Sequence, residues 1–166
     1  MFYRFISENL TDYINEGEWR AGDTDFNYCN LSNADAKDIF EEMVTEKGFF
    51  IFPSDLFVNV RARAAQDENL NETLEGVFRN IEGSAAGTPS ERDLKGLFAD
   101  LDVNSPRLGA TVAQRNRKLA KVLDAIGDLP LGSFEDNSID LFGDAYEYLM
   151  QMYASQAGKS GGEYFT

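Results

Sequence analysis

The residues most able to do chemistry in this sequence are five basic side chains in a segment without a single acidic residue. The segment runs from residue 107 to residue 121, and its cations are Arg107, Arg115, Arg117, Lys118 and Lys121. The rest of the chain carries 10 basic residues (15 minus 5) against 29 acidic ones. Cations on one accessible face are sufficient for non-specific contact with nucleic-acid phosphates. One interpretation of the segment is therefore a contact with a DNA backbone. The alternative is a solvated helix face that pairs with the chain's many carboxylates.

Apolar side chains on the same segment fall on one side of a helix at 100° per residue. The expected buried side holds Leu108, Val112, Leu119, Leu123 and Ile126. The expected exposed side holds Gln114, Arg117, Lys118 and Lys121. Arg115 falls at the edge of the apolar stripe, so we expect it either to extend its head group to solvent or to pair with a buried carboxylate.

Several kinds of catalytic and metal site are excluded by what the sequence lacks. It contains no histidine, so Ser–His and Cys–His catalysis are ruled out and the commonest metal ligand is missing. Four oxygen ligands at the spacing of a calcium loop are not present either. We therefore expect no catalytic residue and no metal site in these 166 residues.

The composition is typical of one packed, acidic domain. Apolar residues make up 43% of the 166 residues and aromatic residues 13%, and the net charge is −14. No apolar run approaches the roughly 20 residues of a membrane span. The single cysteine, Cys29, cannot form an internal disulfide, and it fits a small buried side chain in a reducing cytoplasm. A cytoplasmic protein without a membrane partner is expected.

Apolar periodicity and capping residues predict a mainly α fold, a helical bundle of about seven helices with at most one small β-strand pair. The expected helices cover about residues 1–14, 33–47, 54–65, 70–82, 91–101, 108–126 and 139–157. Gly17 is expected to close the first helix, and Ser90 with Asp93 to make a capping-box-like pair. The apolar run 49–52 fits either a short strand, which would pair with the region around Phe26–Cys29, or a buried extended segment.

The last thirty residues predict a long helix followed by an unusual tail. Apolar residues recur there at steps of three and four, namely Ile139, Phe142, Tyr146, Leu149, Met150, Tyr153 and Ala157. Asn137 or Ser138 can cap this helix, and Gly158 can end it. The tail then reads Gly-Gly followed by Glu163, Tyr164, Phe165 and Thr166.

This C-terminal stretch and several upstream blocks resemble the modification (methylase) subunits of type I restriction-modification systems. The matching blocks are residues 2–9, 48–54, 96–100, 104–109, 140–149 and 157–166. In that family the last two blocks mark the junction between an N-terminal helical domain and a catalytic domain. The resemblance implies that residues 1–158 are the helical domain, truncated at its start. Residues 159–166 would then be a linker and the start of a catalytic domain that lies outside this sequence.

The resemblance also implies an activity for the parent protein. The family transfers a methyl group from S-adenosylmethionine to adenine N6 in double-stranded DNA, and the base is flipped out of the helix. Its partners are a specificity subunit, a second copy of the methylase subunit and a restriction subunit, and its helical domains help to close the complex around DNA. The residues Glu163, Tyr164, Phe165 and Thr166 match the motif that opens the S-adenosylmethionine site.

These 166 residues are nevertheless not expected to be an enzyme on their own. A base methyltransferase needs a Gly-rich loop after a strand and a polar-Pro-Pro-aromatic loop, and no two of the four prolines adjoin. We expect no cofactor for the segment alone. One alternative is a free-standing acidic interaction protein, such as a DNA mimic without catalysis. Another is a helical domain that serves only subunit dimerisation.

Overall fold

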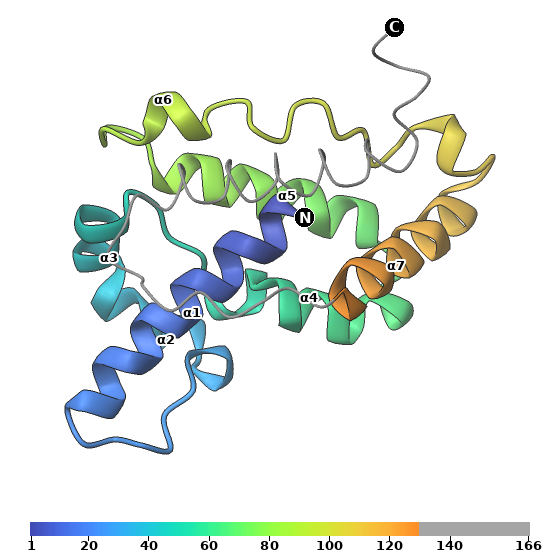
Figure 1. Cartoon of the computed structure of the whole chain (residues 1–166). Helices are drawn as coiled ribbons and strands as arrows, with labels where there is room; N and C mark the ends of the chain where they lie inside the picture. The colour runs from blue at the N-terminus through green and yellow to red at the C-terminus, as the bar shows by residue number, and fades with distance from the viewer. Residues whose placement is uncertain (130–166) are drawn as a thin grey trace, which may run out of the picture.

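The computed structural model describes residues 1–129, and within that range the protein is built of α-helices and short 3₁₀ turns (Figure 1). The α-helices are α1 Phe2–Arg20, α2 Asn33–Ala36, α3 Phe40–Lys47, α4 Phe57–Arg63, α5 Leu70–Ser84, α6 Glu91–Leu94 and α7 Val112–Asp128. The described residues contain no β-strand. The mainly α fold of about seven helices is confirmed. The helix expected over residues 139–157 lies outside the described residues.

The first helix is longer than predicted, because α1 continues through Gly17 to Arg20. Glycine weakens a helix interior by only about 1 kcal/mol relative to alanine, so tertiary contacts can override it. One such contact lies just beyond: the indole N–H of Trp19 donates to the carbonyl of Phe26 at 2.8 Å and ties the end of α1 to the following loop. The prediction that Gly17 closes the helix was therefore wrong.

The N-terminal half of α1 lies across α4 and fixes where α4 begins. The backbone N–H of Phe57, the first residue of α4, donates to the Ser7 hydroxyl at 3.2 Å. Such a bond satisfies one of the backbone donors that every helix start leaves without an internal partner. The Tyr3 ring packs edge-on against Phe57 and Phe78, with centroids 5.4 and 5.5 Å apart, and so joins α1, α4 and α5.

The aromatic run at residues 49–52 forms the centre of the core but does not pair as a strand. Phe49, Phe50 and Ile51 are each at most 2% exposed. The Tyr28 hydroxyl donates to the Ile51 carbonyl at 2.7 Å, and burial raises the pKa of Tyr28. Residues Tyr28–Asn30 form a 3₁₀ turn. The two segments are thus neighbours, as expected, but a buried side chain joins them instead of a strand ladder.

The helical segment before this run is interrupted once and ends at Gly48. Ser32 caps α2 by accepting the N–H of Asp35 at 3.1 Å, and a 3₁₀ turn at residues 37–39 separates α2 from α3. Gly48 has φ +84°, a conformation that glycine adopts without steric cost. A Cβ at Gly48 would also lie 1.9 Å from the Ser90 hydroxyl oxygen, so the close approach of the 83–105 segment requires glycine.

The helix predicted after Ser90 is only four residues long. Within α6, no side chain caps the first turn, so the Ser90–Asp93 capping pair is not formed. Lys95 adopts an extended conformation and Gly96 has φ +75°, and both end the helix. Leu94 is buried, but Leu101 is 51% exposed because the chain continues as turns. Periodic apolar residues alone were not sufficient to sustain a helix here.

Candidate partner and nucleic-acid interface

The basic segment forms α7, and its start is fixed by local hydrogen bonds. The Thr111 hydroxyl accepts the N–H of Gln114 at 3.2 Å, and the Gln114 side chain accepts the N–H of Thr111 at 3.2 Å. This capping box satisfies two donors reciprocally. Gly109 precedes it in close contact with the helix, since a Cβ there would lie 2.7 Å from the Gln114 Cβ. The cations on α7 are therefore carried by a helix with a defined first turn.

Four of the five predicted cations are exposed. Arg107 lies in the 3₁₀ turn Pro106–Leu108, whereas Arg117, Lys118 and Lys121 lie on α7. Gln114 is exposed beside them, as the periodicity predicted. The ion pairs among residues 1–129 are formed by Arg4, Arg20 and Arg61, so none of the predicted cations is paired within that range.

Arg115 is half-buried, and its side chain binds the loop before α7. Its guanidinium donates to the Gly109 carbonyl at 3.2 Å and to the Ala110 carbonyl at 3.5 Å. It makes no ion pair with a carboxylate of the described residues, although such a pair was one of the two expected arrangements. Of the five cations, Arg115 is thus the one whose guanidinium already makes hydrogen bonds within the domain.

The inward face of α7 matches the predicted apolar stripe except at its first residue. Leu119 and Leu123 are 6% exposed, and Ile126 on α7 and Leu108 in the 3₁₀ turn before it are partly buried against the core. Val112 is 46% exposed, contrary to the prediction. The reason is a groove that runs beside α7, of which Val112 forms part of the wall.

This groove, called the α7 groove below, has a volume of about 640 Å³. Its first wall is α7, and its second wall is the 3₁₀ turn Ala64–Gln66 with the two residues that follow it. The lining residues are Ala64, Ala65, Asp67, Glu68, Val112, Ala113, Asn116, Arg117, Ala120, Lys121 and Asp124. Small apolar side chains thus line a hollow whose edges are charged.

A buried asparagine fixes the distance between the two walls. Asn116 is 6% exposed, and its amide nitrogen donates to the Glu68 carbonyl at 2.8 Å. Its amide oxygen accepts the N–H of Asn71, in the first turn of α5, at 3.1 Å. Asn116 therefore caps α5 from α7. Its position within the apolar stripe of α7 is the sequence signal for this role, which was not among the predictions.

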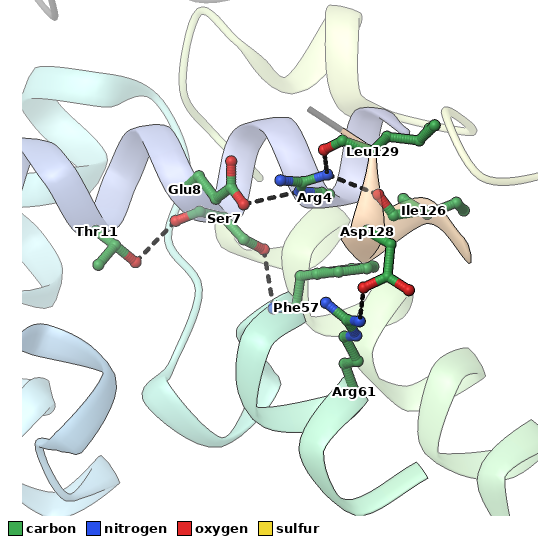
Figure 2. Close-up of polar contacts among 9 residues, drawn as sticks. All are labelled: Arg4, Ser7, Glu8, Thr11, Phe57, Arg61, Ile126, Asp128 and Leu129. Carbon is green, nitrogen blue, oxygen red and sulfur yellow. Dashed lines mark hydrogen bonds and ion pairs between the residues drawn. The ribbon is translucent and has the colours of Figure 1, made fainter. Parts of the chain in front are cut away.

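The C-terminal end of α7 is held by two arginines from other helices (Figure 2). Arg4 of α1 donates to the carbonyls of Ile126 and Leu129 at 2.6 and 2.8 Å. The negative end of the helix dipole stabilises a cation at this position. Arg61 of α4 pairs with Asp128 at 2.6 Å and with Asp124 at 3.1 Å.

The two ion pairs of Arg61 affect its pKa, and its guanidinium lies close to Gly127 of α7. Hydrogen bonds to Asp128 and Asp124 raise the pKa of Arg61. Gly127 leaves space for the guanidinium, because a Cβ at that position would lie 2.1 Å from it. The contacts of Arg4 and Arg61 with the end of α7 could not be predicted from the sequence, since they join residues more than 60 positions apart along the chain.

The remaining predicted site residues, Glu163, Tyr164, Phe165 and Thr166, lie outside the described residues. Within residues 1–129, no group of three or more cysteine, aspartate or glutamate side chains is placed to hold a metal ion. Over the same residues, no helix has the length and apolar character of a membrane span.

Comparison with known families defines the class of protein. Residues 1–126 match the family model of the HsdM N-terminal domain, so the chain belongs to this family. A second family model, N-6 DNA Methylase, matches residues 137–166. The suspected relationship to type I methylase subunits is confirmed, and the alternative of a free-standing DNA mimic is not favoured.

Two individual relatives agree with this assignment. The chain is 46% identical over 173 residues to the type I restriction enzyme MpnII methylase subunit of Mycoplasma pneumoniae, a match that covers all of this chain and 32% of the relative. A crystal structure of the type I restriction-modification methyltransferase subunit from Streptococcus thermophilus superposes with a TM-score of 0.64 and 25% identity. That match covers 92% of this chain and 32% of the other. The chain thus spans about a third of the length of these relatives.

Proposed function

We propose that this chain is the N-terminal helical domain of a type I methylase subunit that methylates adenine N6 in DNA. The observation that carries the proposal is the order of the two family matches. The HsdM N-terminal domain model covers residues 1–126, and the N-6 DNA Methylase model covers residues 137–166. A helical domain followed directly by the start of a methylase is the arrangement that the sequence resemblance implies, with a boundary near residues 158–159.

In this proposal the domain makes subunit contacts and helps to close the complex around double-stranded DNA. Its protein partners are the specificity subunit, a second methylase subunit and the restriction subunit, and the complex works in the cytoplasm. The net charge of −14 supports a surface that mainly binds protein, because an acidic surface repels phosphates over most of its area. DNA would contact the domain only at the basic segment, residues 107–121.

The cofactor of the parent protein would be S-adenosylmethionine, and Glu163, Tyr164, Phe165 and Thr166 would open its site. Residues 1–129 contain no strand followed by a Gly-rich turn and a helix, which is how Rossmann-like folds hold a nucleotide cofactor. The described residues therefore do not fit the cofactor, and no step of methyl transfer is assigned to them.

Methyl transfer by the full-length protein tests the proposal. The full-length methylase subunit, combined with its specificity subunit, is expected to transfer tritiated methyl groups from S-adenosylmethionine to DNA adenine. The 166-residue chain is expected to transfer none and to give no binding heat with S-adenosylmethionine. Unmodified adenine with the full complex, or methylation by the short chain alone, would contradict the proposal.

We further propose that the five cations of the basic segment contact DNA phosphates in this complex. Arg107 and Lys118 are exposed and lie outside the α7 groove, whereas Arg117 and Lys121 line it. Arg115 is the weakest of the five candidates because part of its guanidinium binds the loop before α7. Each phosphate contact contributes about 0.9 to the slope of the logarithm of DNA affinity against the logarithm of salt concentration.

The double variant Arg107→Gln, Lys118→Gln tests this contact in the full complex. The magnitude of the salt slope is expected to fall by about 2, and affinity at low salt should fall for every DNA sequence alike. Arg79→Gln, Lys95→Gln is the matched control, because both side chains are exposed and lie outside the basic segment. An equal slope for the wild type and both variants would assign these cations to solvent.

A further inference from the structure

We infer that Arg4 is a positioning residue for the methylase region, the part of the protein that begins at residue 137 with the match to the N-6 DNA Methylase model. This role rests on the proposed function, because it requires that a methylase domain follows the helical one. Arg4 of α1 and Arg61 of α4 bind the last turn of α7 from two different helices (Figure 2). These two arginines and their partners on and after α7 are called the α7 clamp below.

The α7 clamp holds the backbone on both sides of the point where the helix ends. α7 ends at Asp128, and the next residue, Leu129, is extended with φ −66° and ψ 134°. One nitrogen of Arg4, Nη1, donates to the carbonyl of Ile126 within the helix and to the carbonyl of Leu129 after it. A single side chain thus fixes the direction of the chain where it leaves α7.

The sequence requires a donor of this kind at the end of α7. The residue after Leu129 is Pro130, and a proline disfavours the helical conformation of the residue before it. Proline also has no backbone N–H, so it cannot continue the hydrogen bonds of the helix. The last carbonyls of a helix have no partner within the helix and must find one elsewhere. Arg4 supplies that partner from α1.

The clamp restricts orientation more than it adds stability. The Arg4 side chain is 11% exposed, and its Nε donates to Glu8, one turn further along α1, at 2.8 Å, which holds the guanidinium in one orientation. Asp124 and Asp128, the partners of Arg61, are 62% and 75% exposed. Ion pairs with carboxylates this exposed contribute little to stability. Together, however, the hydrogen bonds from two helices limit the tilt and the rotation of the last turn of α7.

The clamp also lies between the two family matches. The HsdM N-terminal domain model ends at residue 126, and the N-6 DNA Methylase model begins at residue 137. Residues 130–136 are therefore all that separates Leu129 from the methylase region, and a fully extended segment of that length spans at most about 25 Å. With so short a connection, the direction of the chain at Leu129 limits where the methylase region can lie.

Helix α7 would then join the proposed DNA contact to the methylase region. Lys118 and Asp128 lie about 15 Å apart along the helix axis at 1.5 Å per residue. DNA bound at the cations and the methylase region held by the clamp would thus keep a constant relative placement. A misplacement of about 1 Å can lower the rate of a reaction about 100-fold, so Arg4 would affect methyl transfer without contacting substrate or cofactor.

The distance between two spin labels in the full-length methylase subunit tests this role directly. One label is attached at Glu72→Cys, an exposed position on α5, in a background that carries Cys29→Ser, and the other at a cysteine introduced in the methylase region. Arg4→Gln is expected to broaden the distance distribution, because an uncharged amide cannot replace the bonds to both carbonyls. Arg20→Gln is the matched control, since Arg20 lies at the opposite end of α1, is 82% exposed and also pairs with a glutamate one turn away, Glu16.

Single-turnover methyl transfer by the complex with the specificity subunit separates positioning from stability. A loss of positioning lowers the rate constant, whereas a loss of folded protein lowers the amplitude. Arg4→Gln is expected to lower the rate constant at least about ten-fold at unchanged amplitude and unchanged DNA affinity. For Arg20→Gln, a change of less than about two-fold is expected in each quantity, because its ion pair is exposed.

Arg4→Lys keeps a cation at the end of α7 but loses the Nε donor that binds Glu8, so its distance distribution and rate constant should fall between those of the wild type and Arg4→Gln. An unchanged distance distribution or an unchanged rate constant for Arg4→Gln would overturn the inference, as would a loss of amplitude alone. The distance measurement needs no activity. Failure of the wild-type complex to methylate DNA would therefore contradict the proposed function and leave the positioning role to be decided by the labels.

Discussion

Replacing Phe50 by alanine is expected to lower the free energy of unfolding of the 166-residue chain by about 3–5 kcal/mol. Phe50 is 2% exposed, and its ring lies edge-on to Phe52, Phe40 and Tyr28 at centroid distances of 4.9, 5.1 and 6.3 Å. The alanine variant loses the transfer free energy of the ring and leaves a cavity that these neighbours can only partly fill. The effect is large because one ring joins three separate segments of the core.

Urea unfolding followed by circular dichroism measures this loss. Leu101→Ala is the matched surface control, because Leu101 is 51% exposed and should cost less than about 0.5 kcal/mol. Phe50→Leu should fall between the two, since it keeps most of the apolar volume. If Phe50→Ala were no more destabilising than Leu101→Ala, residues 49–52 could not be the centre of the core.

The elements that the sequence predicted correctly are those specified by local patterns. The run 49–52 is apolar at every position and is bounded by Gly48 and Pro53, so burial could be expected without knowing its neighbours. The exposed side of α7 followed from 3.6-residue periodicity alone. Both features depend on residues that are close together in the sequence.

The errors occurred where distant contacts override local preference. The Trp19–Phe26 hydrogen bond holds α1 together beyond Gly17, and no capping rule contains that contact. Of the two arrangements expected for residues 49–52, the buried extended segment is observed: Tyr28 reaches Ile51 with its side chain, so the backbones need not form a ladder. Proximity was predictable there, but the kind of contact was not.

The candidate site likewise combines features that local sequence predicts with features that depend on contacts between distant residues. The cations of α7 could be found from composition, but the α7 groove needs a second wall from residues 64–68, more than 40 positions earlier in the chain. Arg115 illustrates the difference within one helix. Its place at the edge of the apolar stripe was predictable, whereas its binding to the Gly109 carbonyl required the path of the loop.

Replacing Asn116 by alanine is expected to cost about 2–4 kcal/mol, because it leaves two polar groups without partners. The Asn71 N–H at the start of α5 would lose its acceptor, and the Glu68 carbonyl would lose its donor. Asn71 is 9% exposed, so water cannot readily replace the lost bond. The same change would loosen the two walls of the α7 groove.

Native-state hydrogen exchange locates the effect of this change. In Asn116→Ala, the Asn71 amide is expected to exchange faster than in the wild type by a larger factor than amides near Phe50, because α5 loses its cap before the core opens. Asn80→Ala is the control on the same helix: its side chain is exposed and binds Asp55 at 3.0 Å, so a change below about 0.5 kcal/mol is expected. Equal protection of Asn71 in both variants would mean that α7 does not cap α5.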